Sequence, residues 1–550
     1  MEIGKVYIVQ ENEFDFIVIG SGFGGAISTM RLAQKGYSVA LIEKGRRWSK
    51  NDFPKSNWNI KKFLWAPLIR CFGIQQISLL KGVMVLHGAG LGGGSLVYAN
   101  TLMQPDPQIF NNGQWPSEVD WVSELSTPYR LAKKNLGVAI NQCPGDADTE
   151  MKKLAQAMNC ESTYHLTEVG VYFNSEKSAA PSDPYFKGHG PLRNGCTGCG
   201  SCMIGCPVGA KNTLDQNYLF FAEKWGTKVF TEMHVDKISK DDRQNIFQVE
   251  VIPSTPLFKK RSTLKAKNII LAAGVLGTLG LLFKNKYTYK TLPNLPDSLG
   301  DHVRTNGESL CGATSLEKSL KNFSLGIAIG SAFHPDENTK IEPVRYPSGS
   351  DFMKFLAVPL TGNGSGLLRP LKMLSSFIKN IFKLPHLYLK NKWPERTIIL
   401  LIMQSIDQKM SLRYKRSIFS FFKKSVQISQ QSEKIPSYLP TAQIATELLG
   451  KQINGIGQNV ISEVLLDTPA TAHILGGCVI ANDPRKGVVN FQHQVYGYPG
   501  LYVCDGSVVP GNLGVNPSLT ISALAERFSE QFPVSSRINN EEYLFRKNII

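Results

Sequence analysis

The feature that most constrains the fold is a glycine-rich turn between two short apolar strands near the start of the chain. The segment "FDFIVIGSGFGGAISTMRLAQKGYSVALIEKG" contains a strand at 16–19, the turn Gly20-x-Gly22-x-x-Gly25, an amphipathic helix, and a strand at 39–42 that leads to Glu43. Gly20 permits the tight turn, Gly22 lets the backbone approach a pyrophosphate, and Gly25 lets helix and strand pack closely. The helix N-terminus supplies N–H groups to the phosphates. This order of elements predicts a Rossmann-like dinucleotide site.

Two further segments select the cofactor. A carboxylate at Glu43 accepts ribose hydroxyls and repels the 2′-phosphate of NADP, which leaves NAD or FAD. In "HGAGLGGGSLVYANT" (87–101) so little side chain is present that the backbone must pass close to a flat or anionic group, which NAD does not require. Near the C-terminus, a strand from Leu501 and a helix from about Pro517 are predicted, and N–H groups at the start of that helix can stabilise a reduced isoalloxazine ring. FAD is therefore the predicted cofactor.

Several motifs then occur in a fixed order along the chain. They are "GLGGGSLVYANT", "GCPVGAKNTLDQNYL", "NIILAAGVLGT", "LGDHVRTN", "TAHILGGC" and the C-terminal block "LYVCDGSVVPGNLGVNPSLTISALAERF". On these motifs the chain resembles the glucose–methanol–choline (GMC) oxidoreductases over nearly its whole length, and within that family the cholesterol oxidases and their bacterial relatives. The resemblance implies an α/β fold, α+β overall, in which a Rossmann-like FAD-binding domain of GMC type is joined to a substrate domain built on an antiparallel sheet. It assigns 11–125, 190–310 and 464–535 to the FAD domain, 126–189 to a connecting or lid region, and 311–463 to the substrate domain.

The same resemblance implies the residues that hold FAD. Gly20, Ser21, Gly22, Gly25 and Glu43 would hold the ADP half; Gly93, Gly94, Ser95 and Asn100 would line the other half; Val235 would meet the adenine through its backbone; and Asp505, Gly506, Asn516 and Pro517 would close over the ring. Some members tether FAD through a histidine just after the second glycine cluster, where this chain reads "SLVYAN". Noncovalent FAD is therefore expected.

His473 and Asn516 match the histidine and asparagine that face the flavin in the family. Oxidation of an alcohol needs a group that accepts or orients the hydroxyl proton, which would be His473, directly or through water, while Asn516 would orient the substrate oxygen. Where the family has Pro after the histidine, this chain has Ile474, which removes a backbone restraint. Glu395 roughly overlays the carboxylate that moves a double bond in cholesterol oxidases. The alternative for Glu395 is an exposed charge at a strand start.

These residues predict the FAD-dependent oxidation of a secondary alcohol on a hydrophobic substrate, with a 3β-hydroxysteroid such as cholesterol converted to the 3-ketone, and with double-bond isomerisation as a further step. Electrons would pass to O2 or to an acceptor protein. Two alternatives remain open. One is a GMC dehydrogenase for a sugar, polyol or long-chain alcohol that passes electrons through an iron–sulfur cluster. The other is a drifted flavoprotein that acts as a membrane-associated binding protein.

A cysteine run raises the question of that cluster. "CTGCGSCMIGCPVGAK" (196–211) places Cys196, Cys199, Cys202 and Cys206 in the ferredoxin spacing C-x2-C-x2-C-x3-C followed by Pro. Cys196, Cys202 and Cys206 also reproduce the C-x5-C-x3-C pattern of a three-iron cluster found in some sugar-oxidising GMC dehydrogenases. An iron–sulfur cluster, buried thiols and a zinc knuckle remain alternatives, and zinc is less natural because structural zinc ligands usually come as two separated pairs.

The net charge of +17 is concentrated partly in a basic, amphipathic insert at 367–425. There Leu371, Leu374, Ile378 and Ile381 share one helical face, with Lys372, Lys379 and Lys383 away from it, and "LRYKRSIFSFFKK" follows with Arg413, Lys415, Arg416, Lys423 and Lys424. Such a segment is typical either of a lid resting on an anionic membrane or of a core-packing helix with solvated lysines. No nucleic-acid module accompanies the charge, so nucleic acid is not expected as a partner.

Localisation is predicted from three absences in the sequence. The first residues are acidic where a signal peptide would need a basic start. The apolar run at 269–283 is shorter than the roughly 20 residues of a membrane span, and glycines interrupt it. Cysteines outside the run are scattered, unlike a disulfide framework. We expect a cytoplasmic protein, peripheral to the inner face of the membrane.

Overall fold

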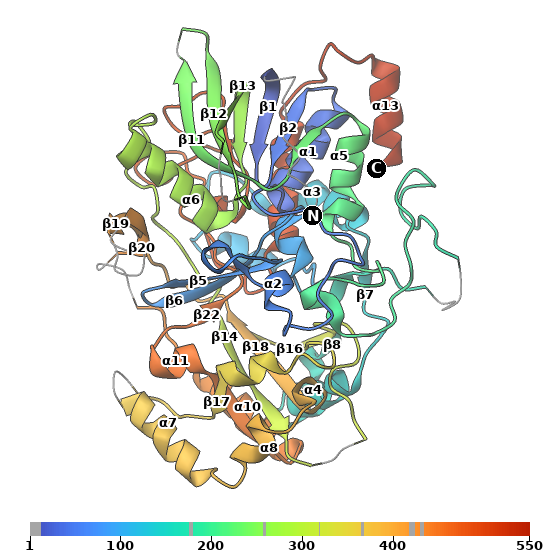
Figure 1. Cartoon of the computed structure of the whole chain (residues 1–550), viewed down its shortest axis with the longest axis vertical. Coiled ribbons are helices and arrows are strands. Elements are labelled where there is room, and N and C mark those ends of the chain that lie inside the picture. Colours follow the sequence, from blue (N-terminus) through green and yellow to red (C-terminus); the bar gives the residue numbers. More distant parts are fainter. Residues whose placement is uncertain are drawn as a thin grey trace.

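The structure, a computed structural model, describes residues 13–174, 180–241, 243–256, 260–317, 320–364, 368–416, 424–429 and 434–550. Two seven-stranded sheets lie one above the other along the long axis of the molecule (Figure 1). Of the predicted basic insert, residue 367 and residues 417–423, with Lys423, lie outside the described residues.

The upper sheet is the predicted dinucleotide-binding sheet. Its strand order is β10-β2-β1-β13-β12-β11, with β23 beside β13. The strands are β1 (Glu13–Ile19), β2 (Val39–Ile42), β10 (Lys228–Phe230), β11 (Met233–Asp241), β12 (Ile246–Pro253), β13 (Ser262–Leu271) and β23 (Leu501–Val503). β10, β2, β1, β13 and β23 pair in parallel, whereas β11, β12 and β13 pair antiparallel. From its second residue on, β1 is buried without interruption, which is typical of a parallel strand covered on both faces.

Three helices from distant parts of the chain pack together against this sheet. They are α1 (Phe23–Gln34), α5 (Tyr218–Lys224) and α12 (Ser518–Glu530), and α3 (Trp121–Asn135) packs on α12. Helix α6 (Gly274–Lys284) follows β13 and contacts β11. The apolar run at 269–283 is thus the end of a strand, a tight turn and a helix, as its glycines indicate.

The lower sheet is antiparallel throughout, in the order β17-β21-β14-β18-β16-β15-β8. Its strands are β8 (His165–Leu166), β14 (Ser309–Ser315), β15 (Ser331–Asp336), β16 (Thr339–Val344), β17 (Ala357–Pro359), β18 (Thr397–Gln404) and β21 (Gly455–Val460). The predicted fold class, a Rossmann-like domain with a second domain on an antiparallel sheet, is confirmed. β8 lies within 126–189, so this predicted connecting or lid region contributes an edge strand to the lower sheet.

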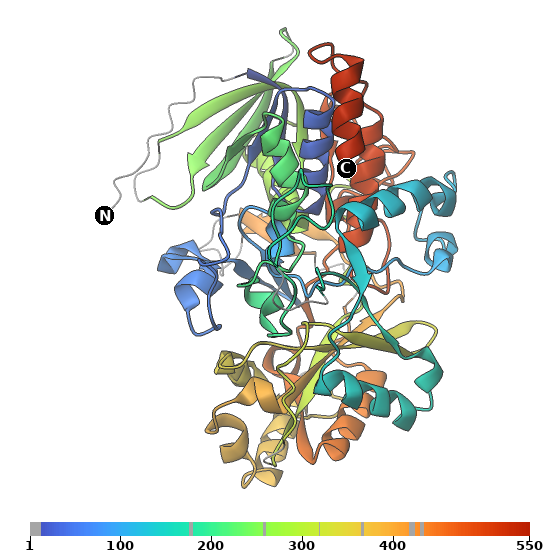
Figure 2. The same ribbon diagram turned by 90° about the vertical axis from the view of Figure 1, so that its right-hand side faces the viewer.

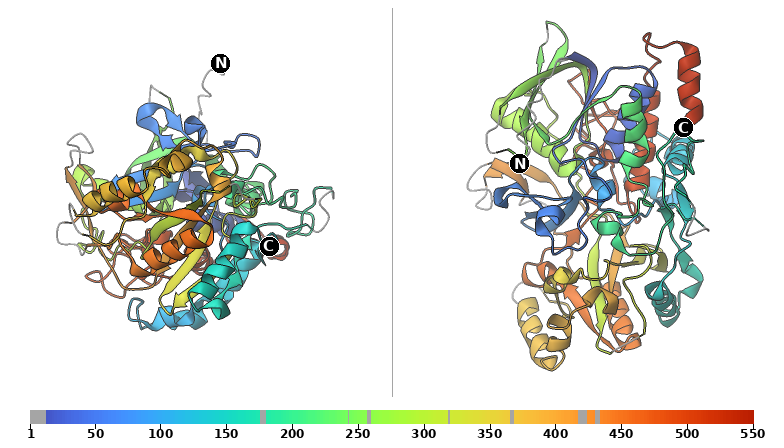
Figure 3. Two further views of the ribbon diagram at one scale, coloured as in Figure 1. Left: turned by 90° about the horizontal axis from the view of Figure 1, so that it is seen from below. Right: turned by 45° about the vertical axis from the view of Figure 1, so that its right-hand side comes forward.

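The two faces of the lower sheet have different partners. In β18, Ile398, Leu400 and Ile402 point into a core shared with α4 (Asp146–Ala157) and α10 (Pro440–Gln452). The alternate residues Thr397, Ile399 and Leu401 line a cavity on the other face. This alternation is the period of two expected of a strand buried on both sides. Seen from below, helices of the lower half cover the end of the molecule that faces the viewer (Figure 3).

A small sheet lies between the two large ones and brings distant motifs together (Figure 1). It consists of β5 (Gln75–Leu80), β6 (Val83–Gly88) and β22 (Ala470–Thr471), and β22 runs parallel to β6. β6 leads into the second glycine cluster and β22 into His473. The sheet therefore places the histidine next to the glycine cluster.

The remaining elements are short or peripheral. They are α2 (Ile60–Phe63), α7 (Leu368–Lys379), α8 (Leu384–Tyr388), α9 (Trp393–Arg396), α11 (Ile461–Leu465), α13 (Asn540–Ile549), β3 (Trp65–Ala66), β4 (Cys71–Phe72), β7 (Val138–Ile140), β9 (Glu168–Gly170), β19 (Leu412–Arg416) and β20 (Lys424–Ile428). Helix α13 lies at the upper end of the molecule, and α7 and α8 lie at the lower end (Figures 1 and 2). Among the described residues, no helix has the length and apolarity needed to cross a membrane.

Candidate active site

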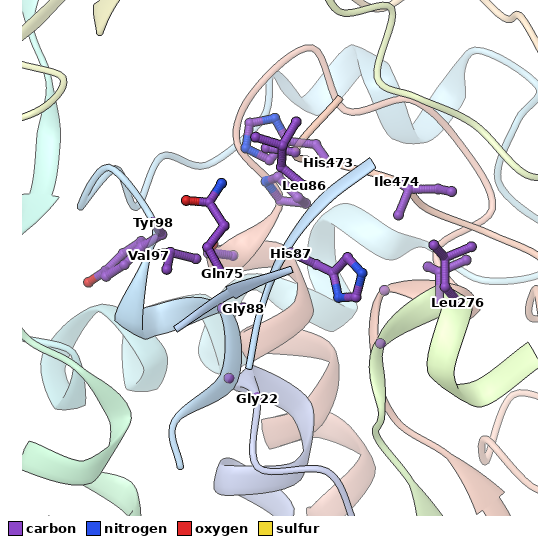
Figure 4. Close-up of a pocket in the computed structure, with 18 of the residues that line it drawn as sticks. Gly22, Gln75, Leu86, His87, Gly88, Val97, Tyr98, Leu276, His473 and Ile474 are labelled. Atoms are coloured by element: carbon purple, nitrogen blue, oxygen red, sulfur yellow. The ribbon is translucent and has the colours of Figure 1, made fainter. Parts of the chain in front are cut away.

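One cavity of about 580 Å³ is lined by residues of the upper sheet, the small middle sheet and the lower sheet. Its volume lies within the usual range for ligand sites. Most of the residues predicted from the sequence are on its wall: Gly20, Ser21, Gly22, Glu43, Gly93, Gly94, Val235, His473, Asp505, Gly506, Asn516 and Pro517. Figure 4 shows Gly22, Tyr98, His87 and His473 around this cavity.

Gly25, Ser95 and Asn100 are not among the wall residues and instead shape the backbone behind it. A Cβ on Gly25 would lie 2.0 Å from the Gly20 carbonyl oxygen, so helix and turn touch there. The Ser95 hydroxyl donates to the Gly92 carbonyl at 2.7 Å and accepts the Leu214 N–H at 3.0 Å. Asn100 is buried with a φ of 73°. Gly25 therefore packs behind the first turn and Ser95 braces the second glycine cluster from within.

Glu43 joins the two glycine-rich turns. One carboxylate oxygen accepts the Ser21 hydroxyl at 2.7 Å, and the other accepts the N–H groups of Gly45 at 2.9 Å and Gly90 at 3.4 Å. The Ser21 hydroxyl in turn accepts the Gly92 N–H at 3.0 Å. The carboxylate therefore fixes the relative position of the two turns while its residue remains on the cavity wall.

The wall fits a dinucleotide cofactor. A Cβ added to Gly22 would meet no protein atom within 4 Å, so the space in front of this backbone is free for a ligand. Gly22 begins α1 without any side-chain cap, and Pro517 likewise begins α12. First-turn N–H groups of both helices are therefore left for an anionic or electron-rich partner. When FAD is bound here, Gly20, Ser21, Gly22 and Val235 would hold its nucleotide half.

His473 is held by a carboxylate that the sequence analysis did not single out. Its Nδ1 is hydrogen-bonded to one oxygen of Glu308, and the other oxygen of Glu308 accepts the Ala472 N–H at 2.8 Å. The His473 N–H also donates to the Thr471 hydroxyl at 2.9 Å. These bonds restrain the turn at which Ile474 replaces the family's proline.

The Glu308 contact sets the ionisation of the imidazole. Burial disfavours the charged ring, but the carboxylates of Glu308 and Glu342 outweigh it and raise the pKa of His473 above its usual value. Because Nδ1 faces Glu308, Nε2 is the ring nitrogen left for chemistry in the cavity.

Asn516 lies directly beside that nitrogen. Its Nδ2 is 3.5 Å from Nε2 of His473 and 3.4 Å from a carboxylate oxygen of Glu342. Among the described residues, its buried Oδ1 has no hydrogen-bond partner. A buried acceptor of this kind needs a donor, which a substrate hydroxyl or a cofactor N–H could supply.

The loop that carries Asn516 is fixed by a second asparagine. Asn306 Oδ1 accepts the N–H groups of Leu513 and Gly514, both at 3.0 Å, and its Nδ2 donates to the Val515 carbonyl at 2.9 Å. The Asn306 side chain thus makes hydrogen bonds with backbone groups of this loop, which in a helix or strand would bond to other backbone groups.

Behind Asn516 lies a buried charge pair. Lys340 Nζ is 3.8 Å from the Glu342 carboxylate, and both side chains are fully shielded from solvent. Burial raises the pKa of Glu342, although Lys340 and His473 oppose that shift. Burial also lowers the pKa of Lys340.

Glu395 is placed away from this constellation. It lies on α9 before β18, its carboxylate accepts the Ser348 hydroxyl, and it is not among the residues that line the cavity. Of the carboxylates on the cavity wall, Glu308 lies beside His473, at the end of the cavity called here the substrate end. Glu43 and Asp505 lie with the predicted cofactor-binding turns.

The cysteine run packs beside the glycine cluster. Burial raises the pKa of the Cys196 thiol to about 12, and the buried Lys211 ammonium donates to the carbonyls of Cys202 and Leu96. In the described part of the chain, no three His, Cys, Asp or Glu side chains converge in a way that could hold a metal ion. The hypothesis of a cluster on Cys196, Cys199, Cys202 and Cys206 is therefore not supported. The four are free thiols, of which Cys202 is buried and the other three are partly buried.

Three residues of the site were missed or undervalued by the sequence analysis. Glu308 directly follows "LGDHVRTNG", so a carboxylate next to a family motif was the available signal. His87, at the start of the segment 87–101, was not proposed as a site residue, but it lines the cavity, and burial lowers its pKa to about 3. The sequence around Glu342 gives no sign of its role, because an acidic residue within a strand is ordinarily predicted to be exposed to solvent.

Comparisons with known proteins show which family the chain resembles. Two models described as GMC oxidoreductase match residues 191–296 and 419–525, and a model described as FAD binding domain matches residues 15–51. A cholesterol oxidase of Acinetobacter baumannii is 40% identical over 543 residues, covering 97% of this chain and 97% of that protein. A cholesterol oxidase of Mycobacterium tuberculosis (strain CDC 1551 / Oshkosh) is 40% identical over 531 residues, covering 95% of this chain and 91% of that protein.

Among solved structures, pyridoxine 4-oxidase from Mesorbium loti superposes with a TM-score of 0.61. Its identity is 14%, and the match covers 94% of this chain and 99% of that one. This likeness concerns the fold alone.

Proposed function

The chain belongs to the GMC oxidoreductase family and is an FAD-dependent oxidoreductase of CH–OH donors, and from this premise we propose that it oxidises a secondary alcohol on a hydrophobic substrate. The substrate class is a 3β-hydroxysteroid of the cholesterol type, and the product is the 3-ketone. The observation that carries the proposal is the pairing of His473 Nε2 with Asn516 in a cavity whose wall along the lower sheet is largely apolar.

The apolar wall supports a steroid over a sugar. Beyond the reacting pair, the cavity is lined largely by Leu310, Ile329, Val344, Tyr346, Met353, Leu356, Trp393, Ile399 and Leu401. A polyol in such a site would leave several hydroxyl groups without partners, at a cost of roughly 1–3 kcal/mol each. The names of the two bacterial relatives point to the same substrate class.

In the proposed reaction, the chain's residues manage the hydroxyl proton. Asn516 Oδ1 or Nδ2 orients the carbinol group, and His473 Nε2 takes its proton as the C=O bond forms. Glu308 keeps the other ring proton on Nδ1 and stabilises the imidazolium by its negative charge. When FAD is bound, it supplies the acceptor for the hydrogen and the electron pair that leave the carbinol carbon.

Isomerisation of the product would need a carboxylate on the cavity wall. Glu395 is poorly placed for it, and at the substrate end Glu308 is the carboxylate on the wall. Oxidation to the 3-ketone is therefore the core of the proposal, and we place isomerisation second to it.

The cofactor is proposed to be noncovalent and to pass its electrons to O2. Acid precipitation should leave the yellow colour in the supernatant, and colour that precipitates with the protein would contradict this attachment. Consumption of O2 during turnover would support the oxidase, whereas turnover only with an added electron acceptor would favour a dehydrogenase.

The deciding experiment is anaerobic bleaching of the flavin. Cholesterol should bleach it rapidly, while glucose should not. A fatty alcohol that bleaches faster than cholesterol would assign the protein to long-chain alcohols instead. Absence of bleaching by every alcohol, with FAD bound, would favour a binding protein.

A further inference from the structure

Helix α7 carries its apolar residues on the outside of the molecule. Leu368, Leu371, Leu374, Ile378, Ile381 and Phe382 form one face, called here the α7 face, and they are between 55% and 91% exposed. A monomeric protein rarely leaves such a contiguous apolar surface in water. The core-packing alternative for this helix is therefore wrong, because the apolar side chains do not face the core.

Two polar side chains of the same helix, Arg369 and Ser376, face the protein. Arg369 is buried, and its guanidinium donates to the Ser437 hydroxyl at 2.7 Å and to the Glu463 carbonyl at 2.9 Å. Ser376 donates to the Leu360 carbonyl at 3.0 Å. The helix is thus anchored by hydrogen bonds with its apolar side turned away from the protein.

The segment that carries the α7 face has only basic charged residues. From residue 352 to residue 394 the chain contains no Asp or Glu. The lysines in and after the helix are exposed and are Lys372, Lys379, Lys383, Lys390 and Lys392. Two copies of this face would repel each other, whereas an anionic surface with an apolar interior would satisfy both kinds of side chain.

Helices α7 and α8 also lie against the segment that lines one end of the cavity. Tyr388 of α8 donates to the Ala357 carbonyl at 2.7 Å, and Ala357 lines the cavity together with Leu356 and Trp393. Ser376 of α7 binds the segment just after Ala357, at Leu360. The two helices therefore sit on the stretch of backbone that forms the cavity wall at the substrate end.

We propose that the α7 face docks the protein on an anionic lipid bilayer, with α7 lying in the interface and the substrate end of the cavity turned toward the lipid. The docking rests on the exposed face alone. Delivery of a hydrophobic alcohol from the bilayer rests in addition on the proposed function.

The test measures sedimentation of the full-length holoprotein with vesicles, without any substrate. Vesicles contain either phosphatidylcholine alone or equal parts of phosphatidylcholine and phosphatidylglycerol. The main variant is Leu371→Glu/Leu374→Glu/Ile378→Glu. Its matched control is Leu544→Glu/Phe545→Glu on α13, where both side chains are also exposed but lie at the opposite end of the molecule (Figure 1). Retained flavin absorbance shows that each variant is folded.

Wild type and the α13 control should bind the anionic vesicles, and the α7 variant should bind at least about tenfold less. Lys372→Gln/Lys379→Gln/Lys383→Gln should weaken binding by about fivefold for each lysine, and salt should weaken it too. Wild type that fails to bind at low salt, or an α7 variant that binds as wild type does, would overturn the proposal. A wild-type dimer that the α7 variant converts to a monomer would also overturn it, in favour of a second copy on this face.

Turnover then separates the docking from the reaction. The α7 variant should oxidise cyclodextrin-solubilised cholesterol at the wild-type rate and lose activity only toward cholesterol in vesicles. If cholesterol is not oxidised in either form, the proposed function fails while the sedimentation result still decides the docking.

Discussion

Glu308 holds His473 at two points, because one carboxylate oxygen pairs with the ring Nδ1 and the other accepts the Ala472 N–H at 2.8 Å. The two residues are 165 positions apart in the chain. The ring and its backbone turn therefore cannot rotate independently of the lower sheet, and Nε2 keeps a fixed direction into the cavity.

Replacing the base tests the assigned chemistry. His473→Gln should lower kcat by about 10²- to 10⁴-fold, which is the usual contribution of a positioned acid or base. The amount of FAD bound should be unchanged, because His473 is not among the residues proposed to hold the nucleotide half. Steady-state kinetics measures the effect, and a variant with nearly normal kcat would remove His473 from the reaction.

Replacing Glu308 tests the positioning role. Glu308→Gln should lower kcat/KM by about 10- to 100-fold, because a hydrogen bond to a charged group is worth about 1.5–3 kcal/mol. The pH profile should also move. Since the carboxylate raises the pKa of His473, activity that needs the neutral ring is lost as pH falls through that raised pKa, and removing the charge should shift this limb to lower pH. A rate loss with no shift of the acid limb would indicate a merely structural role.

Substitutions at two neighbouring glycines should affect cofactor binding and folding separately. A Cβ on Gly22 would meet no protein atom within 4 Å, whereas a Cβ on Gly24 would lie 1.7 Å from the Cys504 carbonyl oxygen. Gly22→Ala should leave the melting temperature of the apoprotein unchanged and weaken FAD binding by roughly 10- to 100-fold, if the methyl group costs about 1–3 kcal/mol of crowding. Gly24→Ala should instead destabilise the fold by a similar or larger amount. Equal FAD affinity in Gly22→Ala and wild type would place the cofactor elsewhere.

Glu395→Gln should change neither the oxidation rate nor the position of the double bond in the product, because its carboxylate binds Ser348 and does not line the cavity. Chromatography of the steroid products provides the measurement. Accumulation of the unisomerised ketone in this variant alone would restore Glu395 as the isomerisation base.

The cysteine run should behave as free thiols without a metal cluster. Protein purified without oxygen should contain neither stoichiometric iron nor labile sulfide. Because burial raises the pKa of Cys196 to about 12, its thiol stays protonated at neutral pH and should react slowly with iodoacetamide. Iron and sulfide in stoichiometric amounts, lost together in Cys202→Ser, would contradict this and revive the dehydrogenase alternative.

The sequence predicted best what lies in continuous motifs. Two such motifs form where they were expected: the strand, turn and helix around Gly20, and the helix after Asn516. Their geometry is set by nearby glycines and by the spacing of apolar residues along the chain. Glu308 and Glu342 could not be assigned in the same way. Their partners come from other elements, and no local pattern says which acid will face a histidine across the fold.

The helix at 368–379 shows a different limit. The helical spacing of its apolar residues places Leu371, Leu374 and Ile378 on one face. The same spacing occurs whether that face packs on the protein or points to the outside. Only the packing of Arg369 and Ser376 against the protein decides the direction.

The pairing of β23 with β13 has a consequence for how the chain acquires its structure. One edge of β13 is completed by residues 501–503, and Gly24 touches the carbonyl of Cys504. A nascent chain emerging from the ribosome therefore carries an unfinished sheet until almost all of it has been synthesised. Contacts of such long sequence separation slow folding and leave apolar strand edges accessible in the meantime. We expect the newly made protein to depend on chaperones, and truncation before residue 501 to yield insoluble material that cannot take up FAD.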